Sequence, residues 1–106
     1  MKIFRGDRSE TGAIVTEDGR PLPLRLKLRN HSPTGFEWGY GGSGPAQLAL
    51  AICSAVVSDQ RALAVYQRFK FRVIGGIEDQ HWELTEAEVL RVIEEIEAEE
   101  KARGEK

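Results

Sequence analysis

The residues best suited to chemistry in this chain of 106 residues lie together in one glycine-rich stretch, residues 30–47. The stretch combines glycines and two prolines with Phe36, Trp38 and Tyr40, and it runs directly into an almost wholly apolar segment, Leu48 to Val57. Glycine is needed where the backbone turns sharply or comes close to another group. A helix that begins directly after such a loop leaves its first N–H groups without intrahelical partners. The stretch therefore predicts a cradle for an anion at the start of a helix.

Residues 39–44, Gly-Tyr-Gly-Gly-Ser-Gly, match the G-x-G-x-x-G pattern of dinucleotide-binding loops. The rest of that fingerprint is missing, because Asp59, which has the spacing of the required acidic residue, falls between two expected helices rather than at a strand end. No lysine follows the glycines, so the P-loop pattern fails as well. A smaller prediction remains, in which backbone N–H groups and the helix dipole favour a phosphate or a carboxylate. The alternative is that the glycines only allow the loop to pack closely on the helix.

We expect the ligand site to combine three kinds of group. The backbone of residues 41–44 supplies N–H donors, although Pro45 removes one donor from the first helical turn. An aromatic wall, side-chain hydrogen bonds and one charge partner complete the set. The predicted ligand-binding residues are Gly41, Gly42, Ser43 and Gly44 for the backbone donors, Trp38 and Tyr40 for the wall, Asn30, His31 and Gln47 for the hydrogen bonds, and Arg29 for the charge.

No catalytic set accompanies this loop. His31 and Ser32 are adjacent in sequence, but a nucleophile and its base must converge in space and need a third group to orient them. Two histidines and the single cysteine, Cys53, give no zinc set, and Cys53 lies among apolar residues, which is typical of a core position. We therefore predict no catalytic residue, no metal site and no cofactor, and a binding protein is favoured over an enzyme.

Charge is divided unevenly along the chain. The formal net charge is −2, but the basic residues lie mainly before residue 73 and the acidic residues mainly after it. Arg68, Lys70 and Arg72 on the second expected helix suit pairing with the glutamates of the third, which would neutralise this asymmetry internally. The basic residues 25, 27 and 29 have no interleaved aromatics, which argues against a nucleic-acid partner. The first residues show no apolar export segment and no run reaches membrane-spanning length, so we expect a cytoplasmic protein without a membrane partner.

The expected elements give an α+β fold in which a small, mainly antiparallel sheet from the first 40 residues packs on a buried central helix, with two amphipathic helices outside. Residues 1–98 form one domain, and residues 99–106 form a charged, frayed tail. Asp18-Gly19 is a hairpin turn signal, and Thr85 with Glu88 forms a capping box. The expected strands are 2–5, 13–16 and 22–29, with 36–38 as a further strand or an extended loop, and the expected helices are 45–57, 60–73 and a third from 85; residues 6–12 are a turn, and 82–84 a brief extended connection.

The run from Asn30 to Ala51, NHSPTGFEWGYGGSGPAQLALA, resembles the signature of an uncharacterised family of small bacterial and phage proteins, a domain of unknown function. The resemblance extends to residues 66–70 and 82–88. It implies no catalytic residue and no ligand. The occurrence of such proteins in phages implies one concrete version of the binding hypothesis, in which the protein sequesters a host nucleotide signal.

The sequence thus leads to two hypotheses of different classes. The first is non-enzymatic binding of a small anionic ligand, a nucleotide among them, at the glycine-rich loop. The second is a protein-interaction or homo-oligomerisation module that uses the apolar stripe of the third helix, Val89, Val92, Ile93 and Ile96.

Overall fold

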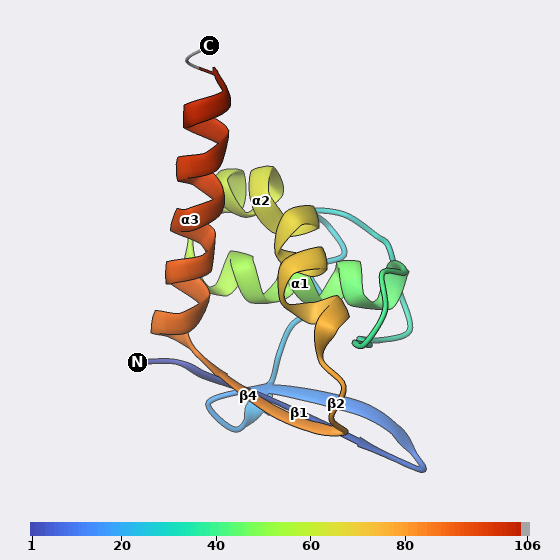
Figure 1. Ribbon diagram of the computed structural model, residues 1–106. Helices are drawn as coiled ribbons and strands as arrows, with labels where there is room; N and C mark the ends of the chain where they lie inside the picture. The colour runs from blue at the N-terminus through green and yellow to red at the C-terminus, as the bar shows by residue number, and fades with distance from the viewer. Residues whose placement is uncertain (105–106) are drawn as a thin grey trace.

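In the computed structural model, which describes residues 1–104, a four-stranded sheet carries three helices on one face (Figure 1). The elements follow in the order β1 (Ile3–Ser9), β2 (Gly12–Glu17), β3 (Arg20–Pro21), α1 (Ser43–Val56), α2 (Asp59–Arg72), a 3-10 turn η1 (Ile74–Gly76), β4 (His81–Thr85) and α3 (Glu86–Gly104). All neighbouring strands are antiparallel, and their order is β3-β2-β1-β4. The expected α+β class, with an antiparallel sheet and a central helix, is confirmed.

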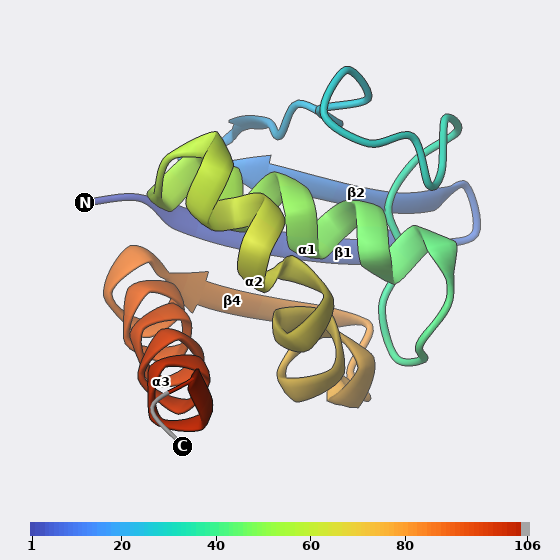
Figure 2. The same cartoon turned by 90° about the horizontal axis from the view of Figure 1, so that it is seen from above.

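Helix α1 occupies the centre of the molecule because it is apolar on nearly every side. Residues 44–53 are all buried, and the helix lies along the sheet beneath α2 (Figure 2). Phe4 and Val15 of the sheet, Phe69 of α2 and Ile93 of α3 belong to the same core. Burial of apolar surface on this scale is the main stabilising term for a domain of this size.

Local sequence signals set the ends of the hairpin and of the outer helices as expected. Asp18 and Gly19 both have positive φ, +51° and +82°, which is the geometry of a two-residue turn between β2 and β3. The Ser58 hydroxyl accepts the Arg61 N–H at the start of α2. At the start of α3, the Glu88 N–H donates to the Thr85 hydroxyl while the Thr85 N–H donates to the Glu88 carboxylate. The capping-box prediction is confirmed.

The expected strand over 22–29 is wrong. Strand β3 ends at Pro21, and the leucines that alternate beyond it lie in an irregular segment. Pro23 lacks an N–H for a ladder, and Arg25 has a φ of +59°, which strand geometry excludes. Leu22 is buried, and Leu24 and Leu28 pack on the core, so the alternation reflects a loop that places leucines against the core. Residues 36–38 also form a loop and no strand.

Strand β4 was expected only as a brief extended connection, and the sheet was expected to come from the first 40 residues. Instead, β4 pairs with β1 along the whole of its length, from Ile3 opposite Thr85 to Asp7 opposite His81. The expected turn over residues 6–12 is also wrong for its first part, because β1 continues to Ser9. Gly6 lies opposite Trp82, and a Cβ at Gly6 would sit 2.2 Å from the indole. The glycine is therefore a strand residue that makes room for a tryptophan.

Helix α3 begins directly after β4, projects steeply from the sheet and is seen almost end-on in Figure 2. It includes residues 99–104, which the sequence analysis assigns to a charged tail. Glu99 pairs with Arg72 and Glu100 with Arg68, each at 2.6 Å, so the expected pairing between the second and third helices is confirmed for these two arginines. Residues 105–106 of the expected tail lie outside the described residues.

The capping box makes the stability of the fold depend on pH. The Thr85 N–H and hydroxyl both donate to the Glu88 carboxylate and hold the pKa of Glu88 below its ordinary value. A carboxyl whose pKa is lowered by folding stabilises the protein above its ordinary pKa, and the contribution is lost as the pH falls through the lowered value. We expect Glu88→Gln to lose about 0.5 kcal/mol of unfolding free energy at pH 7 and almost nothing at pH 3. Urea unfolding at both pH values measures this difference, with exposed Glu10→Gln as the control. Equal acid sensitivity in Glu88→Gln and the parent protein would contradict the prediction.

Candidate functional site

The start of α1 leaves four backbone donors unused. Gly42 is the residue before the helix, and no side chain caps the helix start. Within residues 1–104, the N–H groups of Gly41, Gly42, Ser43 and Gly44 make no hydrogen bond. The first turn carries no acidic residue, so no side chain of the helix itself compensates the positive end of the helix dipole. These are the N–H groups that the sequence predicted as donors to an anion.

A cleft of about 410 Å³ adjoins this helix start. Its walls come from three segments that are far apart in sequence: the β1–β2 turn, the loop after residue 30, and the beginning of α1. Backbone and small polar side chains dominate the lining. The lining residues are Thr11, Gly12, Ala13, Ser32, Thr34, Gly35, Phe36, Glu37, Tyr40, Ser43 and Gly44.

One carboxylate faces the cleft, and its charge is compensated. Glu37 accepts a hydrogen bond from Arg8 at 2.5 Å, and the Arg8 guanidinium also lies 4.3 Å from the centroid of the Trp38 ring. The Arg8 side chain further donates to the Trp38 carbonyl oxygen at 3.1 Å. Arg8 of strand β1 thus compensates the charge of the Glu37 carboxylate. The turn predicted over residues 6–12 gave no reason to expect Arg8 at this position, which the structure places in β1.

Close packing accounts for two of the glycines. A Cβ on Gly44 would lie 2.8 Å from Cβ of Glu37, and a Cβ on Gly42 would lie 2.4 Å from the Tyr40 ring. The contact of Gly44 with Glu37 agrees with the packing explanation left open by the sequence, whereas the contact at Gly42 is with a half-exposed ring of the same loop. Close packing does not explain why four N–H groups of the same segment make no hydrogen bond. The glycines can therefore serve packing and leave these N–H groups available to a ligand.

Gln47 lies in the protein interior and not at the cleft. Its side chain is fully buried, and its amide makes four hydrogen bonds. Oε1 accepts the N–H groups of His31 and Ser32 at 2.7 and 3.0 Å, and Nε2 donates to the carbonyl oxygens of Leu24 and Arg29 at 2.5 and 3.0 Å. A side-chain amide has no further capacity once these bonds are made. Gln47 holds the irregular segment 24–32 on α1.

Four more predicted ligand residues also lie away from the cleft. The His31 ring is 2.7 Å from the Tyr66 hydroxyl. Trp38 is buried, and its indole N–H donates to the Asp79 carbonyl oxygen at 2.9 Å. Arg29 and Asn30 are exposed on the loop, and neither lines the cleft. Of the ten predicted residues, Tyr40, Ser43 and Gly44 line the cleft, and Gly41 and Gly42 connect them.

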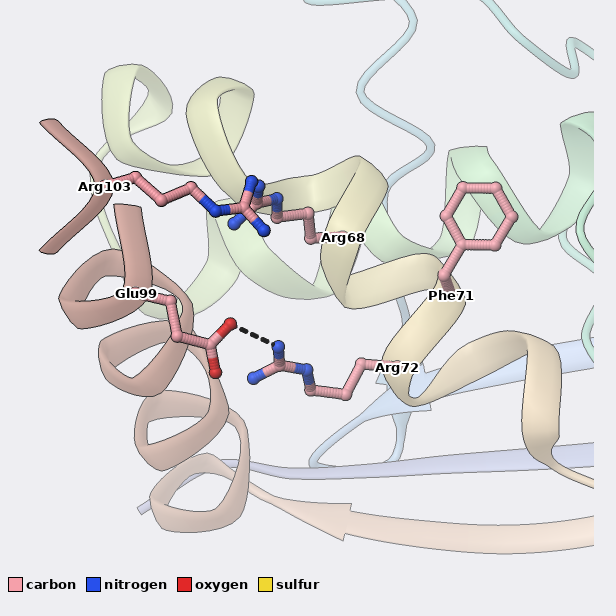
Figure 3. Close-up of a pocket in the computed structure, with 5 residues that line it drawn as sticks. All are labelled: Arg68, Phe71, Arg72, Glu99 and Arg103. Carbon is pink, nitrogen blue, oxygen red and sulfur yellow. Dashed lines mark hydrogen bonds and ion pairs between the residues drawn. The ribbon is translucent and has the colours of Figure 1, made fainter. Parts of the chain in front are cut away.

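A second concave surface lies between α2 and α3, with a volume of about 340 Å³ (Figure 3). Arg68, Phe71, Arg72, Glu99 and Arg103 line this groove. The hydrogen bond from Arg72 lowers the pKa of Glu99, as expected for an ion pair. In Figure 3, Phe71 projects from α2 away from the paired Arg72 and Glu99. This ring reaches the glycine loop, because a Cβ on Gly41 would lie 3.2 Å from Cε1 of Phe71.

Lys70 departs from the expected pattern of pairing. Its side chain does not join Arg68 and Arg72 at the glutamates of α3; the residue is only 7% exposed. Its Nζ lies 4.1 Å from the centroid of the Phe71 ring. In residues 1–104, the ammonium makes neither an ion pair nor a hydrogen bond, so the sequence-based pairing is wrong for Lys70.

The apolar stripe of α3 is already in use. Val89, Ile93 and Ile96 are buried in the core, and Val92 packs against it. The large hydrophobic side chains that remain exposed in the described part of the chain are Met1, Ile14, Tyr40 and Phe71. The last two flank the glycine loop, so exposed apolar surface gathers at the same place as the unused N–H groups.

The described residues were also compared with the requirements of a metal site, a reactive thiol and a membrane-spanning helix. In residues 1–104, no group of three or more His, Cys, Asp or Glu side chains is placed to hold a metal ion. Burial raises the pKa of the Cys53 thiol far above its ordinary value, which keeps it unreactive in the core. None of the helices described has the length and apolar character needed to cross a membrane.

The four bonds of Gln47 predict a large effect of one substitution. Gln47→Met keeps the volume of the side chain but leaves two carbonyl oxygens and two N–H groups without their partner, and we expect a loss of about 2–4 kcal/mol in unfolding free energy. Trypsin cleavage after Arg25, Lys27 and Arg29 should accelerate as the segment detaches. The control is Gln67→Met, which removes a single 3.2 Å bond to Tyr66. Equal urea midpoints and equal cleavage rates for the two variants would show that Gln47 does not hold the segment.

Comparisons with known proteins agree with the resemblance seen in the sequence. Comparison with curated proteins and with solved structures gave no match. A family model described as "Family of unknown function (DUF6166)" matches residues 4–95, which include α1, α2, the glycine loop and all of the sheet except Ile3. Because the match spans most of the chain, the protein belongs to this family of unknown function.

Proposed function

We propose that the protein binds a small anionic ligand, without transforming it, at the glycine loop and the start of α1. The observation that supports this most directly is the set of four N–H groups on residues 41–44 that make no hydrogen bond within residues 1–104, beside a cleft of about 410 Å³. Unused N–H groups at a helix start bind phosphate or carboxylate through hydrogen bonds and through the helix dipole.

The size and lining of the cleft fit a ligand of nucleotide size. Small-molecule sites commonly have volumes of about 300–1,000 Å³. Ser43, Thr11 and Thr34 add hydroxyl groups, and Tyr40 adds an aromatic ring that is 51% exposed. A nucleotide, the ligand class expected from the sequence, would be met in the cytoplasm. By binding such a nucleotide, the protein would sequester a nucleotide signal.

Binding without chemistry is favoured by the engagement of the nearest histidine. The His31 ring is hydrogen-bonded to the Tyr66 hydroxyl and does not line the cleft. Glu37, the carboxylate that lines the cleft, is engaged in an ion pair with Arg8, so neither group is free to activate the hydroxyls of Ser43 and Thr34. A hydroxyl without an activating base is a weak nucleophile.

A proline placed at the first helical position tests the proposal. Ser43→Pro removes one of the four N–H groups, and proline is compatible with this position because Gly42 before it is extended, with φ −91° and ψ −162°. Ser43→Ala, the matched control, removes the hydroxyl and keeps the N–H. A hydrogen bond to a charged group is worth about 1.5–3 kcal/mol, so we expect Ser43→Pro to weaken anion binding by about 10- to 100-fold. Calorimetric titration with inorganic phosphate and a panel of nucleotides measures this change.

The control separates backbone recognition from other effects. Ser43→Ala should keep most of the affinity, and circular dichroism should show equal helix content in both variants. If the parent protein binds none of the probes at millimolar concentration, or if Ser43→Pro binds as tightly as Ser43→Ala, the proposal fails.

A second candidate function is contact with another protein or with a second copy of the chain. The apolar stripe of α3, which the sequence assigned to this role, is buried, but Phe71 is 69% exposed beside Tyr40. A self-associating protein would show a mass above 11.9 kDa by light scattering, and Phe71→Ser should return it to the monomer. A monomer at all concentrations would remove homo-oligomerisation from consideration.

A further inference from the structure

The two edges of the sheet differ in how they are protected. Strand β3 forms one edge; it has only two residues, and Pro21 and Pro23 lie at its end and just beyond it. Proline has no N–H to offer, so it hinders the approach of a further strand. Strand β4 forms the other edge, on the outer side of β1 (Figure 2), and its five residues include no proline. An edge strand of this kind can pair with another chain.

Strand β4 directs part of its backbone away from β1. Residues of an antiparallel pair alternate between those that exchange hydrogen bonds with the partner strand and those that do not. The Arg8 N–H donates to the Gln80 carbonyl oxygen at 2.9 Å, which fixes this alternation for the register of β1 and β4. His81 and Glu83 therefore point their N–H and carbonyl groups to the open side. Within residues 1–104, these backbone groups make no hydrogen bond.

A small apolar cleft borders β4 on the helix side of the sheet, with a volume of about 150 Å³. A cavity of this size with an apolar lining can hold a molecule such as benzene, so it can hold one aliphatic or aromatic side chain. Leu84 follows Glu83 directly, so the cleft adjoins the open backbone groups. The lining consists of Phe69 and Val73 of α2, Leu84 of β4, and Glu88, Val89, Arg91 and Val92 of α3.

The surroundings of this open edge are acidic. Residues 78–88, which contain β4 and the start of α3, have no lysine or arginine, and their carboxylates are Glu78, Asp79, Glu83, Glu86 and Glu88. Within residues 1–104, only Glu83 among them makes an ion pair, at 2.8 Å from Arg5. A second copy of the chain would bring like charges together at this edge, whereas a segment with lysine or arginine would bring complementary charge.

We propose that the open edge binds an extended segment of a partner protein, which pairs with β4 as a further strand and alternates apolar with basic side chains. Side chains of a strand alternate between the two faces of the sheet. An apolar side chain beside Leu84 enters the apolar cleft, and basic side chains on the opposite face lie next to Glu83. Backbone hydrogen bonds then supply affinity, and the apolar cleft supplies specificity. This inference goes beyond the proposed function, because none of these residues lines the cleft at the glycine loop.

Titration of the full chain with a synthetic peptide tests the inference. The probe is Lys-Val-Lys-Val-Lys-Val-Lys with blocked ends, and calorimetry and NMR of the backbone amides follow its binding. We expect binding to slow hydrogen exchange of the His81 and Glu83 N–H groups by about 10-fold or more, because pairing covers them. A peptide with serine in place of valine, and one with glutamate in place of lysine, should each bind about 10-fold more weakly or less tightly still.

A proline in the open edge tests the backbone pairing itself. Glu83→Pro removes an N–H that points away from β1, a position at which an edge strand tolerates proline. Glu83→Ala, the matched control, removes the same carboxylate and keeps the N–H. We expect the peptide to bind Glu83→Pro about 5- to 10-fold more weakly than Glu83→Ala. Phe71→Ser, which alters a different exposed apolar surface, should leave peptide binding unchanged.

Several results would overturn the inference. They are the absence of peptide binding at millimolar concentration, binding that leaves the His81 and Glu83 N–H groups unprotected, and equal binding of the serine peptide, none of which depends on the folding of a variant. A mass of twice 11.9 kDa by light scattering that Glu83→Pro returns to the monomer would assign the edge to a second copy instead. Any of these results can occur while Ser43→Pro weakens phosphate binding as expected, so the two proposals are tested separately.

Discussion

The buried amide of Gln47 is the interaction on which the candidate site depends. It lies on the central helix and has no solvent-exposed surface, and its four hydrogen bonds hold a segment that forms no regular secondary structure. That segment continues into Ser32, Thr34 and Gly35, which form one wall of the cleft. Without the amide, the backbone groups of an irregular loop would have to be satisfied by water, and a wall made from such a loop would lose its shape. A single side chain of α1 thus fixes the position of the loop that forms this wall of the cleft.

Local signals in the sequence predict the helices well, because caps and turns depend on neighbouring residues. Ser58, Thr85 with Glu88, and Asp18-Gly19 all act where they were expected. The errors concern pairing between distant segments. The alternating leucines of residues 22–29 look like a strand, but a loop lying on a core produces the same alternation. The missing N–H of Pro23 and the left-handed backbone at Arg25 show the difference. Strand β4 was missed because its partner, β1, lies at the opposite end of the sequence.

In the candidate site, too, the features that depend on neighbouring residues could be predicted, and those that depend on distant segments could not. The unused donors of residues 41–44 follow from a glycine loop that precedes a helix, and the sequence predicts them. The engagement of Gln47 and Trp38 within the protein depends on the carbonyl oxygens of Leu24, Arg29 and Asp79, which no local pattern places beside them. Lys70 shares its spacing with Arg68 and Arg72, so the sequence groups all three as surface cations. Its burial is a result of how α2 packs, and it becomes visible only in three dimensions.

The strand order β3-β2-β1-β4 carries a consequence for how the chain is made. Strand β1 lies between β2 and β4. Strand β2 follows β1 directly in the sequence, whereas β4 ends only at Thr85. On a ribosome, the hairpin of β1 and β2 can form early, but one side of β1 keeps its ladder groups open until most of the protein has been synthesised. An open strand edge is a template for association with other chains, and contacts of long sequence separation form slowly. The newly made protein therefore passes through a stage in which this edge needs protection, and the arrival of β4 ends that stage.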